Sequence, residues 1–176
     1  REAVRLARRL ALPLEGYTAD GGFFVEGDSP LLEAHQRLLG VEAEGADLLR
    51  LSSPLVRLQV LAEGEAPVER LLEALPRGLQ AHVAESPKMP GVRFVSLTKE
   101  GVSKLSAARL VAEAYGLPLS ECAMVGDGEN DLELLRAVGV GIAMGNAPPS
   151  VKRAAQRVVA PVEACGLAEA LRLLRG

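Results

Sequence analysis

The apolar residues of this chain recur with two different spacings, and the alternation between them predicts a mixed α/β protein. Runs with the pattern of a strand begin at Phe23, Leu55, Leu79, Val92 and Ala123. Stretches with helical spacing lie before, between and after these runs, and we expect helices over residues 1–12, 30–39, 66–75, 106–115, 149–155 and 166–174. Short loops join these elements, which favours strands and helices packed in layers.

One segment near the carboxyl end has the pattern of a βαβ unit. It consists of an apolar run at 123–125, a polar turn at 126–130, a helix that begins at Leu132, a second apolar run at 140–144, and a second turn at 145–149. The two strands of such a unit are parallel, so both turns lie at the same carboxyl edge of the sheet. Open α/β folds bind their ligands at this edge.

Two aspartates of this segment indicate a cation site. Asp127 follows the first strand directly, and Asp131 lies in the first turn of the helix, so their carboxylates can converge on one point. A pair of carboxylates suits Mg²⁺, which keeps several waters and uses few protein ligands. Helix capping alone would also explain acids at these positions. Capping does not require Gly126 and Gly128 on either side of Asp127, or Asn130 beside Asp131, so we favour the cation site.

Three motifs resemble those of a known family. GDGEND at 126–131, AMGNA at 143–147 and GVSK at 101–104 together resemble the carboxyl half of a haloacid dehalogenase-like (HAD) hydrolase of the Cof-type phosphatase subfamily. A GDGxND motif alone is shared with phosphoserine phosphatases and with the phosphorylation domain of P-type cation pumps. The other two motifs, and a stretch between Gly22 and Lys99 that suits an inserted cap, favour the Cof type.

The resemblance implies a fold class and a division into domains. The fold would be α/β, with a Rossmann-like parallel-sheet HAD core, incomplete here, and an inserted α+β cap domain. Residues 1–22 would be a core segment, residues 23–96 the cap, and residues 97–176 the core segment with the metal and phosphate motifs. Gly21 and Gly22 would form either a hinge into the cap or a simple tight turn.

The resemblance also implies the roles of four side chains. Asp127 would bind Mg²⁺, Asp131 would orient the metal through water, and Asn130 would hold a phosphoryl oxygen. A lysine at a helix start is unfavourable for the helix dipole, so an anion near Lys104 is expected, and the lysine of the family's third motif binds phosphate there. Lys99 is a second choice for that lysine.

The attacking aspartate of the family is absent from these 176 residues. It lies in a DxDGT motif, and here no two of the five aspartates are separated by a single residue: Asp20, Asp28, Asp47, Asp127 and Asp131. The chain begins at Arg1 without a methionine, and we interpret it as a fragment with little or no turnover alone. Its incomplete core would then associate with itself or with a complementing chain.

Two other classes of function stay open. A non-catalytic domain that binds phosphate and Mg²⁺ would keep the cation and phosphate contacts without a nucleophile. The phosphorylation domain of a cation pump is disfavoured, because the sequence has no membrane-length apolar run and no DKTGT-like motif.

The composition of the chain limits the classes of partner that it can bind. The chain is 48% hydrophobic, with a net charge of −3 and a pI near 5.5, and it contains only two Tyr and three Phe. These values give no case for nucleic acid binding, and no apolar run approaches the length that spans a membrane. The family resemblance implies a small phosphorylated substrate, such as a sugar phosphate or a nucleotide or cofactor phosphate. Cys122 and Cys165 are isolated and indicate reduced thiols, hence a cytoplasmic protein. His35 and His82 have no partner cluster in sequence, and we expect structural roles for both.

Overall fold

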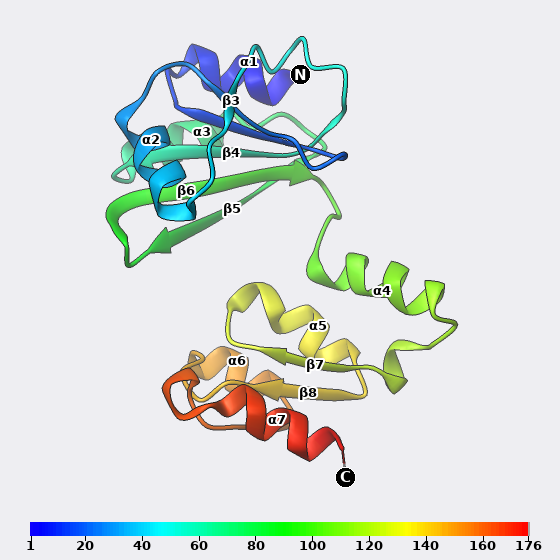
Figure 1. Ribbon diagram of the computed structural model, residues 1–176. Coiled ribbons are helices and arrows are strands. Elements are labelled where there is room, and N and C mark those ends of the chain that lie inside the picture. The colour runs from blue at the N-terminus through cyan, green and yellow to red at the C-terminus, as the bar shows by residue number, and fades with distance from the viewer. Residues whose placement is uncertain (176) are drawn as a thin grey trace. The chain divides into compact units, whose positions relative to one another are not determined.

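The computed structural model describes residues 1–175, and its contacts divide the chain into two compact units, Arg1–Glu100 and Gly101–Gly176 (Figure 1). Each unit has its own sheet and its own hydrophobic core. Within the described residues, no helix is long and apolar enough to cross a membrane. The α/β fold class expected from the sequence is confirmed.

The unit Arg1–Glu100 is built on a six-stranded sheet with three helices (Figure 1). The strand order is β3-β2-β1-β4-β6-β5; β2 and β3 are parallel and the other neighbours are antiparallel. The strands are β1 Leu14–Thr18, β2 Phe23–Glu26, β3 Glu44–Gly45, β4 Leu55–Glu63, β5 Leu79–Ser86 and β6 Met89–Lys99. The helices are α1 Glu2–Arg9, α2 Pro30–Leu39 and α3 Ala66–Glu73.

The two faces of this sheet are covered differently. Alternate residues of the strands, among them Leu14, Val60 and Val95, pack with α1 and α3 in one buried cluster. On the opposite face, Leu61 and Phe94 pack with α2 in a second cluster. The α2 helix begins as the sequence predicts: the Ser29 side chain caps its first turn and Pro30 takes the first helical position. The α2 helix covers only part of this face.

The position of residues 1–22 differs from the predicted domain division. We predicted that residues 1–22 belong with 97–176 and that the cap begins at residue 23. In the structure, β1 lies inside the six-stranded sheet and pairs with both β2 and β4, so residues 1–22 share one unit with 23–96. Gly21, with a φ of +89°, lies in the tight turn between β1 and β2.

The unit Gly101–Gly176 contains the βαβ unit predicted from the sequence. A three-stranded parallel sheet has the order β7-β8-β9 (Figure 1). Its strands are β7 Ala123–Gly126, β8 Val140–Ala143 and β9 Arg157–Val158, and its α-helices are α4 Lys104–Ala114, α5 Leu132–Ala137, α6 Pro149–Ala154 and α7 Gly166–Leu174. Three short 3-10 helices complete it: η1 Leu119–Glu121, η2 Glu129–Asp131 and η3 Val162–Ala164.

Gly139 connects α5 to β8 for a reason other than the expected one. The sequence pattern indicates a left-handed cap at Gly139, but this residue is not among the glycines with positive φ. Instead, a Cβ at this position would lie 1.9 Å from the carbonyl oxygen of Ser120. The close approach of two backbone segments therefore requires glycine here.

This close approach predicts a large cost for a small substitution. We expect Gly139→Ala to lower the free energy of unfolding by about 1–3 kcal/mol, because the added methyl group must displace backbone. Gly45→Ala is a matched control, since a Cβ there meets no atom within 4 Å. Urea unfolding followed by circular dichroism checks the prediction, and equal midpoints for the two variants would contradict it.

Candidate functional site

The two polar turns of the βαβ unit meet at the carboxyl edge of the parallel sheet, as predicted. Asp127 directly follows β7, and Asn146 lies in the turn after β8. Asn146 Nδ2 donates to Asp127 Oδ2 at 3.3 Å, while Asn146 Oδ1 accepts from the backbone N–H of Val162 at 3.1 Å. The Asp127 side chain is thus oriented by an amide that is itself held by the backbone. Asp127 remains exposed to solvent.

Asp131 is the buried centre of the site. It is 1% exposed and ends η2, immediately before α5. Its Oδ2 accepts the backbone N–H groups of Asp127 and Gly128, each at 3.1 Å. Its Oδ1 lies 2.5 Å from Lys104 Nζ. One carboxylate therefore fixes both the backbone of the turn and the position of the lysine.

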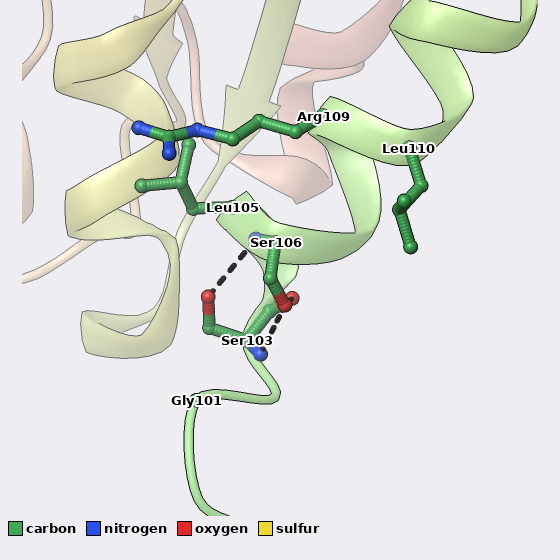
Figure 2. A pocket seen from close by; sticks show the side chains of 6 residues that line it. All are labelled: Gly101, Ser103, Leu105, Ser106, Arg109 and Leu110. Carbon is green, nitrogen blue, oxygen red and sulfur yellow. Dashed lines mark hydrogen bonds between the residues drawn. The ribbon is translucent and has the colours of Figure 1, made fainter.

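Lys104 is the first residue of α4, and the anion beside it in the structure is the carboxylate of Asp131, whereas the sequence indicated a phosphate. The side chain of Lys104 is 48% exposed, so donors of its ammonium group can still reach a ligand. Ser103 and Ser106 cap the helix reciprocally, with Ser106 N donating to Ser103 Oγ at 3.1 Å and Ser103 N to Ser106 Oγ at 2.8 Å (Figure 2). Lys99, the second choice, ends β6 in the other unit.

The glycines of the GDGEND turn are explained by the same contacts. A Cβ on Gly126 would lie 2.7 Å from Asp131 Oδ2, and a Cβ on Gly128 would lie 2.5 Å from Asn130 Oδ1. The buried Asp131 carboxylate therefore requires glycine at position 126, whereas a Cβ at position 128 would displace only the end of the Asn130 side chain. Asn130 itself is exposed at this turn.

The donor set fits a magnesium ion held by few protein ligands. Among residues 1–175, no group of three or more His, Cys, Asp or Glu side chains comes together as a metal site. Asp127 offers an exposed carboxylate, whereas both oxygens of Asp131 already accept hydrogen bonds. Mg²⁺ accepts such a set, because it keeps several waters and needs only one or two carboxylates.

A hollow of about 450 Å³ beside α4 is separate from the acidic turn. Its lining residues are Gly101, Ser103, Leu105, Ser106, Arg109 and Leu110 (Figure 2). In Figure 2, Leu105 and Arg109 point to one side of the helix and Leu110 to the other. None of the predicted site residues lines this hollow.

No separate role was predicted for Asn146, although it lies within the AMGNA motif. Ser150 was also missed, and its Oγ donates to Glu129 Oε1 at 3.2 Å, which links α6 to the same turn. The signal that was available for both was position, since each follows β8 at the sheet edge where Asp127 lies.

Comparison with known proteins identifies the family. The family model of haloacid dehalogenase-like hydrolases matches residues 62–171, more than half of the chain. The chain therefore belongs to the haloacid dehalogenase-like hydrolase family, and the Cof-type resemblance of its motifs is confirmed.

Three similar proteins illustrate this membership. HMP-PP phosphatase from Cronobacter sakazakii is 31% identical over 137 residues, which cover 75% of this chain and 48% of that protein. Phosphoglycolate phosphatase from Methanothermobacter thermautotrophicus is 34% identical over 82 residues, covering 47% and 37%. A solved phosphatase of the HAD superfamily from Bacteroides thetaiotaomicron is 28% identical with a TM-score of 0.74, covering 98% and 62%. The chain thus spans less than half of the length of the two curated relatives.

Proposed function

We propose that these residues belong to a Mg²⁺-dependent phosphomonoester hydrolase that acts on a small phosphorylated metabolite, such as a sugar phosphate. The observation that carries the proposal is the cluster in which Asp131 joins Lys104 to the turn that holds Asp127. Family membership supports it, as do the names of the relatives, which are phosphatases of small phosphorylated compounds.

Each residue of the cluster has a distinct role in this proposal. Asp127 would hold the metal directly, and Asp131 would orient it through water while it positions Lys104. Lys104 and Asn130 would contact oxygens of the phosphoryl group. When bound, Mg²⁺ supplies charge neutralisation for phosphoryl transfer. Positioning and electrostatics are then the main contribution of these residues.

The covalent step needs two further aspartates. One attacks the phosphorus and displaces the alcohol, forming an aspartyl-phosphate that water hydrolyses, and the other protonates the leaving alcohol. We propose that both come from outside these 176 residues. The end position of β7 in its sheet and the exposed Leu110, Val111 and Tyr115 of α4 support association with a complementing chain, or with a second copy.

The net charge and the two cysteines bear on the partners and the cellular location of the protein. The net charge of −3 argues against a nucleic-acid partner, and the structure describes both cysteines as free thiols. We propose a small-molecule substrate and a cytoplasmic location, with neither a nucleic acid nor a membrane as partner.

The first experiment combines intact mass with turnover. The protein is purified from its source gene, weighed by mass spectrometry, and assayed for hydrolysis of p-nitrophenyl phosphate with Mg²⁺ or EDTA. We expect a mass above that of this chain, or a second polypeptide, with Mg²⁺-dependent release that Asp127→Ala lowers by at least about 100-fold. The 176 residues alone should release little or nothing.

A variant of a different acidic residue is the control for Asp127→Ala in that assay. Glu121→Gln removes a charge from η1, which lies before β7 at the opposite end of the strand from Asp127, and should keep full activity. Release that persists in EDTA, or in Asp127→Ala, would contradict the proposal. Mg²⁺ binding without release, even in a longer protein, would instead favour the non-catalytic binding domain or an inactive fragment.

A further inference from the structure

The six-stranded sheet of the unit Arg1–Glu100 has two edges that differ in length. At one edge, β3 consists of only two residues. At the other edge, β5 runs for eight residues, Leu79–Ser86 (Figure 1). Edge strands are commonly kept short, or carry proline, lysine or a bulge, because their unpaired backbone groups attract a further strand. The β5 strand contains neither proline nor lysine, and its ladder with β6 is regular up to Glu85.

The hydrogen-bond pattern of the β5–β6 hairpin shows which backbone groups of β5 point outward. The backbone N–H of Glu100 donates to the carbonyl of Gly78 at 2.9 Å, next to the pair Leu79 and Lys99. Bonded and non-bonded pairs alternate in an antiparallel ladder, so the even-numbered residues of β5 bond to β6. The odd-numbered residues direct their N–H and C=O groups away from the sheet: Ala81, Val83 and Glu85.

These outward groups form the free edge of the sheet. Among the described residues, β5 pairs with no strand other than β6. Leu79 differs from the other odd-numbered residues, because its N–H donates to the carbonyl of Pro76 at 3.3 Å in the preceding turn. Its own carbonyl still points outward. The edge therefore offers alternating donors and acceptors to a further antiparallel strand.

The side chains along this edge form an apolar row. Ala81 pairs with Leu97 of β6, and Val83 pairs with Val95. Both β6 residues belong to the buried cluster that packs with α1 and α3. Val83 is nevertheless 44% exposed, so the apolar layer is open at the edge. A strand added beside β5 would cover it through cross-strand contacts.

The sequence of β5 is complementary to itself in one antiparallel register. When Ala81 of one copy lies opposite Ala81 of a second copy, Val83 lies opposite Leu79 of the second copy. The apolar row is then matched along its whole length. Position 85 in turn lies opposite position 77, which places two opposite charges together at each end of the row.

The charges at the ends of the row support this register. Arg77 is exposed and forms no ion pair within residues 1–175, whereas other arginines of the unit do: Arg8, Arg37, Arg50 and Arg93. Glu85 pairs with Arg93, but its side chain stays 67% exposed and can accept a second guanidinium. Opposite charges across a strand pair are stabilising, whereas like charges are destabilising.

Other registers, and a plain solvated edge, explain less. With the two-fold axis at position 82, Glu85 would lie opposite the apolar Leu79, and with the axis at position 83 it would lie opposite Ala81. A solvated edge requires neither an exposed Val83 nor an arginine placed to meet Glu85 of a second copy. The register with the axis at Ala81 accounts for both features.

We propose that β5 pairs with β5 of a second copy of this chain, antiparallel and with the two-fold axis at Ala81, so that the two sheets join into one. The two Ala81 residues exchange both backbone hydrogen bonds, and each Val83 N–H donates to the Leu79 carbonyl of the second copy. This interface is separate from the association proposed at β7 and α4. It does not depend on the proposed hydrolase activity.

Disulfide cross-linking of the 176-residue chain tests the register. The native thiols are first removed by Cys122→Ser and Cys165→Ser. Single cysteines are then introduced as Ala81→Cys, His82→Cys or Val83→Cys, and each protein is mildly oxidised. Only the residue on the axis faces its own copy, at a Cα separation of about 5.5 Å that a disulfide can bridge. We expect Ala81→Cys to give at least about fivefold more cross-linked dimer than the other two.

Variants of Val83 test the backbone pairing. Val83→Pro removes an N–H that points outward and bonds to no residue of β6, so it should block the dimer and spare the sheet. Val83→Thr keeps this N–H and is the matched control. Sedimentation equilibrium measures the dissociation constant of the dimer, which we expect to rise at least about tenfold in Val83→Pro relative to Val83→Thr. Circular dichroism checks that both variants keep the fold.

Charge variants test the ends of the interface. Arg77→Glu places two carboxylates together and should raise the dissociation constant by about 3–10-fold. Lys88→Glu changes another exposed charge, beyond β5, and should have little effect. Equal dissociation constants in these two variants would contradict the assigned register.

Three results would overturn the proposal as a whole. They are no cross-link in Ala81→Cys, stronger cross-linking at position 82 or 83, and equal dissociation constants in Val83→Pro and Val83→Thr. Leu110→Ser alters the exposed apolar surface of α4 and should leave the cross-link at position 81 unchanged. Loss of that cross-link in Leu110→Ser would assign the self-association to α4 and would likewise overturn the proposal.

Discussion

Asp131→Ala should lower the free energy of unfolding of the unit Gly101–Gly176 by about 2–4 kcal/mol. The variant removes the acceptor of two backbone N–H groups and the anion beside Lys104. Each lost acceptor costs about 1–3 kcal/mol if the donor stays buried. The lost ion pair contributes less to this destabilisation, because the Lys104 side chain is half exposed and water can solvate its charge. Urea unfolding followed by hydrogen exchange at residues 123–143 measures the effect.

Asp131→Asn is the matched variant. It keeps one side-chain oxygen for the N–H groups of Asp127 and Gly128 but loses the charge beside Lys104. We expect about half of the destabilisation that Asp131→Ala causes, because the turn keeps a side-chain acceptor. We expect Mg²⁺ affinity to fall as much as in Asp131→Ala, because both variants remove the negative charge. If Asp131→Ala unfolds at the same urea concentration as the parent chain, Asp131 is not the organising residue of the turn.

Glu15→Ala should destabilise the unit Arg1–Glu100 by about 3–5 kcal/mol. The carboxyl group of Glu15 is the shared partner of His35, Tyr17 and Gln59, and removing one member of a buried pair leaves the others without compensation. Thermal unfolding followed by circular dichroism measures the loss.

Two controls accompany this variant. Glu44→Ala truncates an exposed glutamate of β3 in the same sheet and should stay within about 0.5 kcal/mol of the parent chain. Glu15→Gln keeps the size and one acceptor, so it should fall between the two. Equal stability of Glu15→Ala and Glu44→Ala would mean that the buried network does not stabilise this unit.

The residues near the metal motifs could be predicted from the sequence because their signals are local. The strand, the glycine-rich turn and the helix follow one another between 123 and 137, so period and turn chemistry were sufficient. The placement of Lys104 beside an anion was also predictable, because a lysine at a helix start is unfavourable without one. Asn146 contacts Asp127 because the strands before these two residues end at the same edge of the sheet.

The residues around Glu15 could not be predicted in this way. Residues 14–17 have a weak strand pattern, because they include a glutamate and a glycine, yet β1 lies inside the six-stranded sheet. The partners that compensate Glu15 lie 20 and 44 residues further along the chain, at His35 and Gln59. A structural role was predicted for His35, but its burial against Glu15 was not. Only tertiary contacts explain the strand β1 and the burial of His35. The same contacts place residues 1–22 in the unit Arg1–Glu100.

A Mg²⁺ titration of the labelled chain tests the central claim most directly, since it needs no turnover. The account predicts saturable shifts of the amide signals of Gly126, Asp127 and Gly128. Asp127→Asn should weaken this binding by at least about tenfold, because loss of even a supporting group costs about 10–100-fold in metal affinity. Glu121→Gln should leave it unchanged. No saturable shift at these amides, or equal affinity in Asp127→Asn and Glu121→Gln, would contradict the claim that this turn is a magnesium site.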